Sequence, residues 1–276
     1  MPAAPAIQAN GAAIPAIGLG TWQLRGEAAS HAVTHALNVG YRGIDTAAMY
    51  DNEEAVGAGI RASGRPRGDV FVTTKVWYTD LAPGDLQRSA EASLKRLGLD
   101  HVDLLLIHWP NPDIPLEGSI PALCDARRRG LARNVGVSNF PVALLERALM
   151  LATEPLVANQ CEYHPLLDQS KVLAACRKHG LAFISYCPIG KGVVLDTAVI
   201  REIAARHRKT AAQVVLRWHV QQGVAAIPKS GDPGRIAENL DVFDFTLSDD
   251  EMRSLSGLAR PDGRMVSPGW VERWDS

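Results

Sequence analysis

The alternation of short apolar runs with longer amphipathic stretches is the feature of this sequence that most constrains its fold. Eight such runs predict strands at residues 17–21, 41–45, 70–75, 102–108, 134–138, 156–161, 182–186 and 224–228. Their nearly continuous apolar character is typical of parallel strands that are covered by helices. Eight strand–helix units in about 240 residues predict a (β/α)8 TIM barrel, with residues 1–276 as a single domain.

The predicted barrel carries additional elements near both ends of the chain. Asn10-Gly11 lies between two short apolar stretches, which predicts a type I′ β-hairpin at the N-terminus. Additional C-terminal helices are predicted at 210–222, before the eighth strand, and at 248–258, after the eighth unit.

The main alternative fold is an open, doubly wound sheet that binds a dinucleotide. Gly18-Leu19-Gly20 resembles the start of the glycine-rich fingerprint of such sheets, but the third glycine is missing. The bulky Trp22 is also a poor fit where a pyrophosphate would approach the backbone. We therefore reject this alternative.

Charge and cysteine content exclude several classes of protein. The chain has 29 basic and 30 acidic residues, a formal net charge of −1, so it lacks the basic surface of nucleic-acid binders. Its four cysteines show no Cys-x-x-Cys pair, and no strand ends in a His-x-His pair, so no metal site is expected. No apolar run has the length of a membrane span and no signal peptide is visible, so we expect a cytoplasmic protein.

Polar side chains stand at seven consecutive predicted strand ends, where barrel enzymes place their active sites. They are Asp45, Lys75, His108, Ser138 with Asn139, Gln160, Tyr186, and Lys229 with Ser230; Tyr50 lies in the loop after the second strand. Individually, Asp45 and Lys75 could form a structural ion pair, and His108 could be a satisfied core histidine. The repetition at seven consecutive strand ends is harder to reconcile with stability alone.

Five longer motifs make the chain similar to a known family. Residues 41–53, 104–110, 136–140, 159–165 and 227–230 resemble the motifs of the aldo-keto reductases, in the same order. The resemblance runs from about residue 14 to residue 264. Asp262-Gly263-Arg264 and the compact loops most resemble the bacterial 2,5-diketo-gluconate reductase branch.

The resemblance implies a catalytic tetrad of Asp45, Tyr50, Lys75 and His108. Tyr50 would donate a proton to the reduced carbonyl, and His108 would hydrogen-bond the carbonyl oxygen. An ordinary phenol has a pKa of about 10, and bringing it to ~7 requires about 4 kcal/mol of phenolate stabilisation. An ammonium ~4 Å away supplies roughly that much, so we expect Lys75 to lower the pKa of Tyr50, with Asp45 as its counter-ion.

The resemblance also implies that NADP(H) lies across the mouth of the barrel. Its implied contacts are Gly20, Thr21, Trp22, Asp45, Ser138, Asn139, Gln160, Tyr186, Lys229, Ser230, Arg235, Glu238 and Asn239. Lys229, Ser230 and Arg235 would bind the 2′-phosphate, while Glu238 and Asn239 would contact adenine. Asp232 departs from the family pattern and places a carboxylate beside this cluster, so strict NADPH preference does not follow from the sequence.

The expected partner is a small carbonyl compound. The protein is expected to be a monomer, which is the commonest form in the family. Its pocket is expected to contain Trp22, Tyr50, Trp77, His108 and Trp109. Short loops favour small polar carbonyls such as diketo acids, α-dicarbonyls or aldehydes. Trp270 and Trp274 could either fold over the mouth or dock on the barrel wall.

Two other functions remain open for this sequence. Lys75 could be the Schiff-base nucleophile of a lyase, although the Lys229, Ser230 and Arg235 cluster would then have no role. The chain could also be a non-catalytic, NADP(H)-binding regulatory protein, although the complete tetrad argues against this.

Overall fold

The computed structural model describes residues 5–271 and 274–275 of the protein. Eight parallel strands form its centre: β3 (Gly18–Gly20), β4 (Gly43–Asp45), β5 (Phe71–Val76), β6 (Val102–Ile107), β7 (Ala132–Ser138), β8 (Leu156–Glu162), β9 (Ala182–Tyr186) and β10 (Ala225–Ala226). Each pairs with its neighbour in the sequence. Bridges from Ile17 to Ala226 and from Gly20 to Lys229 join the first strand to the last. The predicted (β/α)8 TIM barrel is therefore confirmed.

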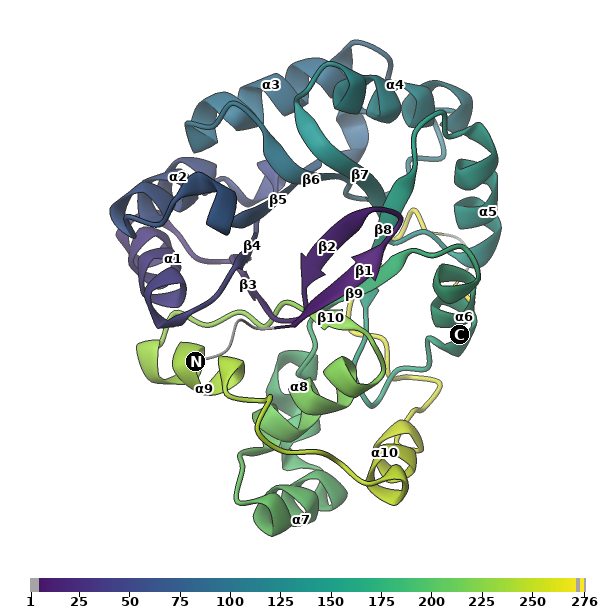
Figure 1. The fold of residues 1–276 in the computed structure, drawn as a ribbon. Helices are drawn as coiled ribbons and strands as arrows, with labels where there is room; N and C mark the ends of the chain where they lie inside the picture. Colours follow the sequence, from purple (N-terminus) through teal and green to yellow (C-terminus); the bar gives the residue numbers. More distant parts are fainter. Residues whose placement is uncertain (1–4, 272–273, 276) are drawn as a thin grey trace.

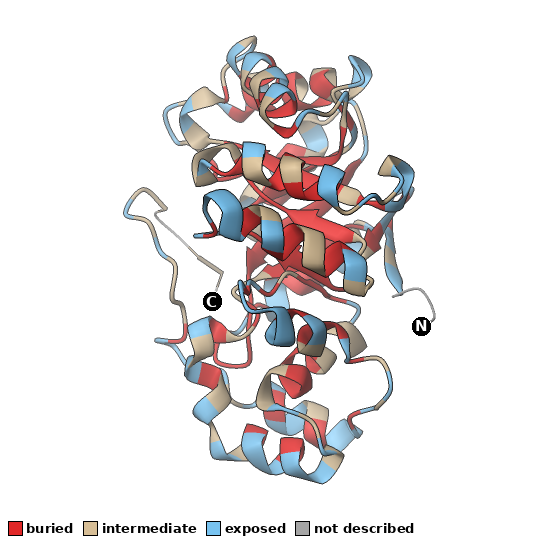
Figure 2. Cartoon of the chain, turned by 90° about the vertical axis from the view of Figure 1, so that its left-hand side faces the viewer, coloured by how far each residue is buried: buried red, intermediate tan, exposed pale blue. Residues whose placement is uncertain are grey.

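Helices surround this barrel as an outer ring (Figure 1). They are α1 (Gly26–Val39), α2 (Glu53–Ala62), α3 (Asp85–Leu97), α4 (Leu116–Arg128), α5 (Val142–Leu151), α6 (Ser170–Lys178), α7 (Ala198–His207), α8 (Ala211–Gln221), α9 (Pro233–Leu240) and α10 (Asp249–Ser256). Buried residues gather on the strands and on the inward faces of the helices, whereas the outward faces are exposed (Figure 2). No helix in the described ranges is long and apolar enough to cross a membrane.

The N-terminal hairpin covers one end of the barrel. Strands β1 (Ala6–Ala9) and β2 (Ala12–Pro15) are antiparallel, and positive φ angles at Asn10 (43°) and Gly11 (92°) confirm the type I′ turn. The Asn10 side chain donates hydrogen bonds to the carbonyls of Leu156 and His179 at 2.8 and 3.1 Å, which tie the turn to the barrel.

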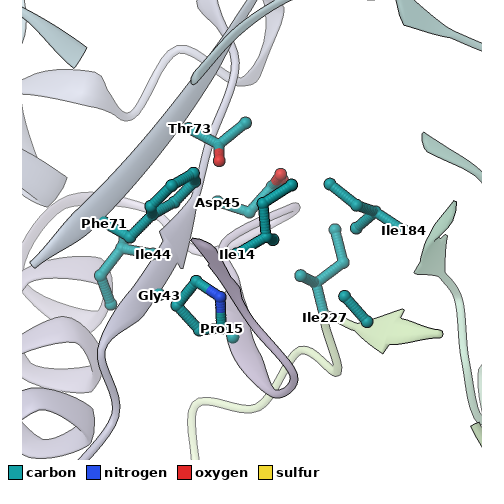
Figure 3. A pocket seen from close by; sticks show the side chains of 11 residues that line it. Ile14, Pro15, Gly43, Ile44, Asp45, Phe71, Thr73, Ile184 and Ile227 are labelled. Carbon is teal, nitrogen blue, oxygen red and sulfur yellow. The ribbon is translucent and has the colours of Figure 1, made fainter. Parts of the chain in front are cut away.

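A cavity of about 20 Å³ lies between the hairpin and the barrel interior. Ile14 and Pro15 of the hairpin face it from one side, and Asp45 and Thr73 reach it from the strands (Figure 3). This volume is close to the minimum that holds one water molecule. The hairpin therefore closes this end almost completely, and polar chemistry is left to the end where the strands terminate.

Candidate active site

Lys75 is the centre of the polar cluster at the carboxyl ends of the strands. It lies on β5 and is 0% exposed, beside Asp45, the last residue of β4. Its Nζ donates hydrogen bonds to Asp45 Oδ1 at 2.5 Å, to the Thr46 carbonyl at 2.9 Å and to the Tyr50 hydroxyl at 3.4 Å. Three oxygen acceptors thus compensate the ammonium for the loss of water.

Tyr50 reaches Lys75 from a short 3₁₀ helix, η1 (Ala48–Tyr50), that follows β4. Burial raises the pKa of its phenol, and the Lys75 ammonium lowers it by less. The expectation that Lys75 alone brings this pKa near 7 is therefore wrong, because desolvation disfavours the phenolate more strongly. Tyr50 keeps its proton at neutral pH, which is the state that a proton donor requires.

The Lys75 ammonium remains charged despite complete burial. Burial alone would lower its pKa, but the charge of Asp45 and the contact with Tyr50 raise it above its usual value. The Asp45 carboxylate is itself held on its other oxygen, where Gln160 Nε2 donates at 2.8 Å. A neutral, nucleophilic amine is therefore disfavoured at this position.

His108 follows β6 and completes the cluster. Its ring centroid lies 5.6 Å from that of Tyr50, and the residue is 7% exposed. Nδ1 is buried without a hydrogen-bond partner among the described residues. Burial and the nearby Lys75 hold the pKa of His108 well below its usual value. The ring is therefore neutral, and its Nδ1, which is unpartnered in the described part of the chain, argues against a satisfied core histidine.

Polar residues of β7, β8 and β9 form a hydrogen-bonded wall beside this cluster. The Tyr186 hydroxyl donates to Asn139 Oδ1 at 2.7 Å, and Asn139 Nδ2 donates to the His108 carbonyl at 3.0 Å. The Ser138 hydroxyl donates to the Gln160 carbonyl at 2.7 Å. The four residues expected to face a nicotinamide ring are thus brought together and fixed in place.

The residues expected to bind the 2′-phosphate meet at the N-terminus of α9. Lys229 and Arg235 are exposed, and no carboxylate in the described part of the chain forms an ion pair with either. Ser230 lies between them in sequence and is nearly buried. The Asp232 carboxylate accepts a hydrogen bond from the Arg235 backbone N–H at 2.8 Å and so caps the helix. Two exposed cations without an ion-pair partner among the described residues suit a phosphate, and the Asp232 carboxylate lies beside them as the cap of the helix.

The other expected cofactor contacts lie at different depths. Glu238 is partly exposed and accepts a hydrogen bond from Thr210 at 2.7 Å, while Asn239 is buried. Gly20 is buried, and Thr21 is 0% exposed because its hydroxyl donates to the Asp45 carbonyl at 2.9 Å. Of the predicted rim residues, only Trp22 reaches the surface, with 40% of it exposed.

Aromatic rings surround the opening above Tyr50 and His108. Trp22 lies 4.9 Å from Tyr50, and Trp77 lies 5.1 Å from His108, between ring centroids. Trp109 is buried nearby. The five residues predicted for the substrate pocket are therefore close together, and among the described residues no group of His, Cys, Asp and Glu could hold a metal ion.

The C-terminal tail folds over this pocket. Trp270 stacks on Tyr78 with centroids 4.6 Å apart and planes 6° apart, and it lies 6.5 Å from Trp77. Trp274 lies 6.1 Å from Trp109. Of the two arrangements open for the tail tryptophans, the structure adopts the one over the mouth. Tyr78 is a pocket residue that the sequence motifs do not predict; its position next to Trp77, after β5, is the signal that could have identified it.

Comparison with known proteins places this arrangement in one family. The aldo/keto reductase family model matches residues 16–260. The chain is 40% identical over 267 residues to the methylglyoxal reductase DkgB of Escherichia coli O157:H7, covering 95% of this chain and 100% of that protein. A crystal structure assigned provisionally to 2,5-diketo-D-gluconic acid reductase B has a TM-score of 0.96 and 44% identity, with 99% of this chain and 98% of that chain covered.

The chain belongs to the aldo/keto reductase family and is an NADP-dependent oxidoreductase. A Bombyx mori aldo-keto reductase solved in complex with NADP is similar to it, with a TM-score of 0.88, 36% identity and 94% coverage of both chains. The exposed cations at α9 and the wall formed by Asn139, Gln160 and Tyr186 fit such a cofactor.

Proposed function

We propose that this enzyme reduces small, uncharged aldehydes and α-dicarbonyls, with Tyr50 as the proton donor. The observation that carries the proposal is the position of the Tyr50 hydroxyl, 3.4 Å from the buried Lys75 ammonium and beside the neutral His108 ring. A carbonyl oxygen placed between Tyr50 and His108 would face two hydrogen-bond donors.

Each member of the tetrad has a separate task in this proposal. Bound NADPH supplies the hydride. His108 Nε2 holds the carbonyl oxygen, and Tyr50 passes its proton to that oxygen as negative charge develops there. Lys75 stabilises the phenolate that remains on Tyr50. Asp45 and Gln160 keep the Lys75 ammonium in position.

The lining of the pocket supports uncharged substrates. The rings described around the opening are neutral: Trp22, Tyr50, Trp77, Tyr78, His108, Trp109 and Trp270. The guanidinium of Arg264 lies 3.8 Å from the centroid of the neighbouring Trp274 ring. A diketo acid would bring a carboxylate among these rings, where a cation would be needed to offset desolvation. The Escherichia coli relative is a methylglyoxal reductase, which agrees with the preference for a small α-dicarbonyl.

NADPH oxidation, followed by absorbance, tests the proposal. The panel contains methylglyoxal, glyoxal, simple aldehydes and diketo acids, each with NADPH and with NADH. We expect the highest kcat/KM for the uncharged α-dicarbonyls with NADPH. Higher kcat/KM for the diketo acids would overturn the substrate class. Borohydride trapping of a carbonyl on Lys75 without nucleotide would instead favour the lyase, which the buried and charged Lys75 argues against.

We also propose that residues 1–276 act as one domain and as a monomer. The family model covers most of this length and supports the single domain. A single calorimetric unfolding transition and a light-scattering mass of one chain are the expected results. Two transitions or a dimer mass would contradict them.

A further inference from the structure

Glu162 is a buried carboxylate for which the proposed reaction has no use. It is the last residue of β8 and is 0% exposed. His164 Nε2 donates to its Oε1 at 2.9 Å, and the backbone N–H groups of Met265 and Val266 donate to Oε1 and Oε2 at 2.7 and 2.8 Å. A buried carboxylate is costly unless such donors surround it, so its contact with the tail is a strong one.

The strand that carries Glu162 also carries a residue of the active site. Side chains two apart on a strand point to the same side, so Glu162 and Gln160 share one face of β8. Gln160 holds Asp45, and Glu162 is the register partner of Tyr186 on β9. Glu162 therefore lies next to the wall expected to face the nicotinamide, at the point where the tail reaches the barrel.

The tail between this contact and the pocket is short. From Val266 to Trp270 the chain has four steps, which span at most about 14 Å when fully extended. Lys191 also holds this region, since its Nζ donates to the Met265 carbonyl at 3.2 Å. Beyond Trp270, the Asp275 side chain accepts a hydrogen bond from the Val142 backbone N–H at 2.7 Å. Trp270 thus lies between two anchors, of which Glu162 is the buried one.

We propose that Glu162 is a positioning residue that latches the C-terminal segment, residues 262–271, and thereby holds Trp270 over the substrate pocket. The proposal rests on the proposed function, because it assigns Glu162 a part in binding the carbonyl substrate. Glu162 itself touches neither the reacting atoms nor the cofactor. Its replacement should release the segment, weaken binding of the carbonyl and leave the proton donor and the 2′-phosphate site intact.

The first test compares Glu162→Gln with Trp270→Ala and with the double variant, using methylglyoxal. We expect each single variant to raise the KM by about tenfold, as loss of one apolar wall does. The kcat and the Kd of NADPH should change by less than about twofold. The double variant should be no worse than the more impaired single variant, because both changes remove the same contact. Multiplying effects, or an unchanged KM, would overturn the latch.

Glu53→Gln is the matched control for the loss of a buried carboxylate. Glu53 is 1% exposed on α2 and pairs with Arg96 at 2.6 Å, without contact to the tail. The Glu53→Gln variant should have a lower melting temperature than the unaltered enzyme but the same KM for methylglyoxal. If Glu162→Gln does not fold, Val266→Pro is the second variant, since it deletes one N–H that donates to Glu162 and leaves the carboxylate in place.

Hydrogen exchange separates failure of the latch from failure of the proposed function. In Glu162→Gln, exchange should accelerate in peptides that contain the Met265 and Val266 amides, but not in peptides from β5 or β6. This readout requires no turnover. Unchanged protection at these two amides would overturn the latch even if the KM rose. Absence of carbonyl reduction by the unaltered enzyme would overturn the proposed function instead.

Discussion

The pKa of Tyr50, the proposed proton donor, depends on its surroundings. Burial and the Lys75 ammonium act on the pKa of Tyr50 in opposite directions, and burial prevails. The Lys75 ammonium therefore does not deprotonate the Tyr50 hydroxyl before the carbonyl is reduced. It becomes important when the phenolate forms, because it is already in place 3.4 Å from the oxygen.

Replacing Tyr50 by phenylalanine removes the proton and little else. We expect Tyr50→Phe to lower kcat for carbonyl reduction by about 10²- to 10⁴-fold, the usual contribution of a general acid. The Kd of NADPH, measured by fluorescence titration, should stay nearly the same. Tyr163→Phe is the matched control, because the Tyr163 hydroxyl bonds Gln222 away from the tetrad. A Tyr50→Phe enzyme with near-normal kcat would exclude Tyr50 as the donor.

The pKa shifts of Tyr50 and His108 predict a broad pH plateau. Reduction needs protonated Tyr50, which is lost only as the pH rises through a pKa that lies above 10.0. It also needs neutral His108, which is lost only as the pH falls through a pKa well below 6.5. We therefore expect kcat/KM for the free enzyme to be flat between pH 6.5 and pH 10, when measured with a substrate that does not ionise. A limb centred near pH 7 would show that one assignment is wrong.

The proximity of the four proposed tetrad residues could be predicted from sequence, because each lies at a strand end or in the loop that follows it, and a barrel gathers all strand ends at one mouth. The pKa of Tyr50 could not be predicted in this way. It depends on desolvation by side chains from separate segments, such as Trp22 near the start of the chain. The contacts of Trp270 could not be predicted either, because the tail has no hydrophobic periodicity from which its conformation could be inferred.

The presence of a helix is easier to predict from sequence than the residues at which it begins and ends. The apolar stripe of α3, formed by Leu86, Ala90, Leu94 and Leu97, is buried as its spacing predicts. By contrast, the apolar pattern predicts a helix at residues 120–129, whereas α4 begins at Leu116 and runs through Pro121. Strand β10 is only Ala225–Ala226, whereas 224–228 was expected, because Pro228 has no N–H to continue the ladder.

The packing of α2 against α3 requires a glycine. A Cβ added at Gly57 would lie 2.0 Å from the carbonyl oxygen of Leu97, which is backbone and cannot rotate away. Alanine gains about 1 kcal/mol of helix propensity, but such overpacking costs about 1–3 kcal/mol. We expect Gly57→Ala to lower the melting temperature in calorimetry. Gly68→Ala is the control, since nothing lies within 4 Å of its added Cβ. Equal stability of the two variants would contradict this account.

Lys229, the first residue of the cluster proposed to bind the 2′-phosphate, lies where the first and last strands of the barrel meet. The Gly20 backbone N–H donates to the Pro228 carbonyl at 3.0 Å, next to Lys229, so β3 and the segment after β10 are joined there. A ligand bound at Lys229 and Arg235 would therefore reinforce a contact between residues about 200 positions apart in the chain. Such a ligand stabilises the whole fold, because the unfolded chain cannot form the site.

This placement predicts that binding of the 2′-phosphate raises the free energy of unfolding of the entire protein. At a concentration one hundred times its Kd, NADPH should add about 2.7 kcal/mol to the free energy of unfolding and raise the melting temperature by about 5–10 °C. NADH at the same concentration should add less, since it lacks the 2′-phosphate.

Lys229→Ala and Arg235→Ala should each weaken NADPH binding by about tenfold or more and leave NADH almost unaffected. The NADPH shift would then approach that of NADH, whereas Arg253→Ala, on the surface of α10, should change neither. Equal losses for both cofactors would mean that Lys229 and Arg235 do not bind the 2′-phosphate.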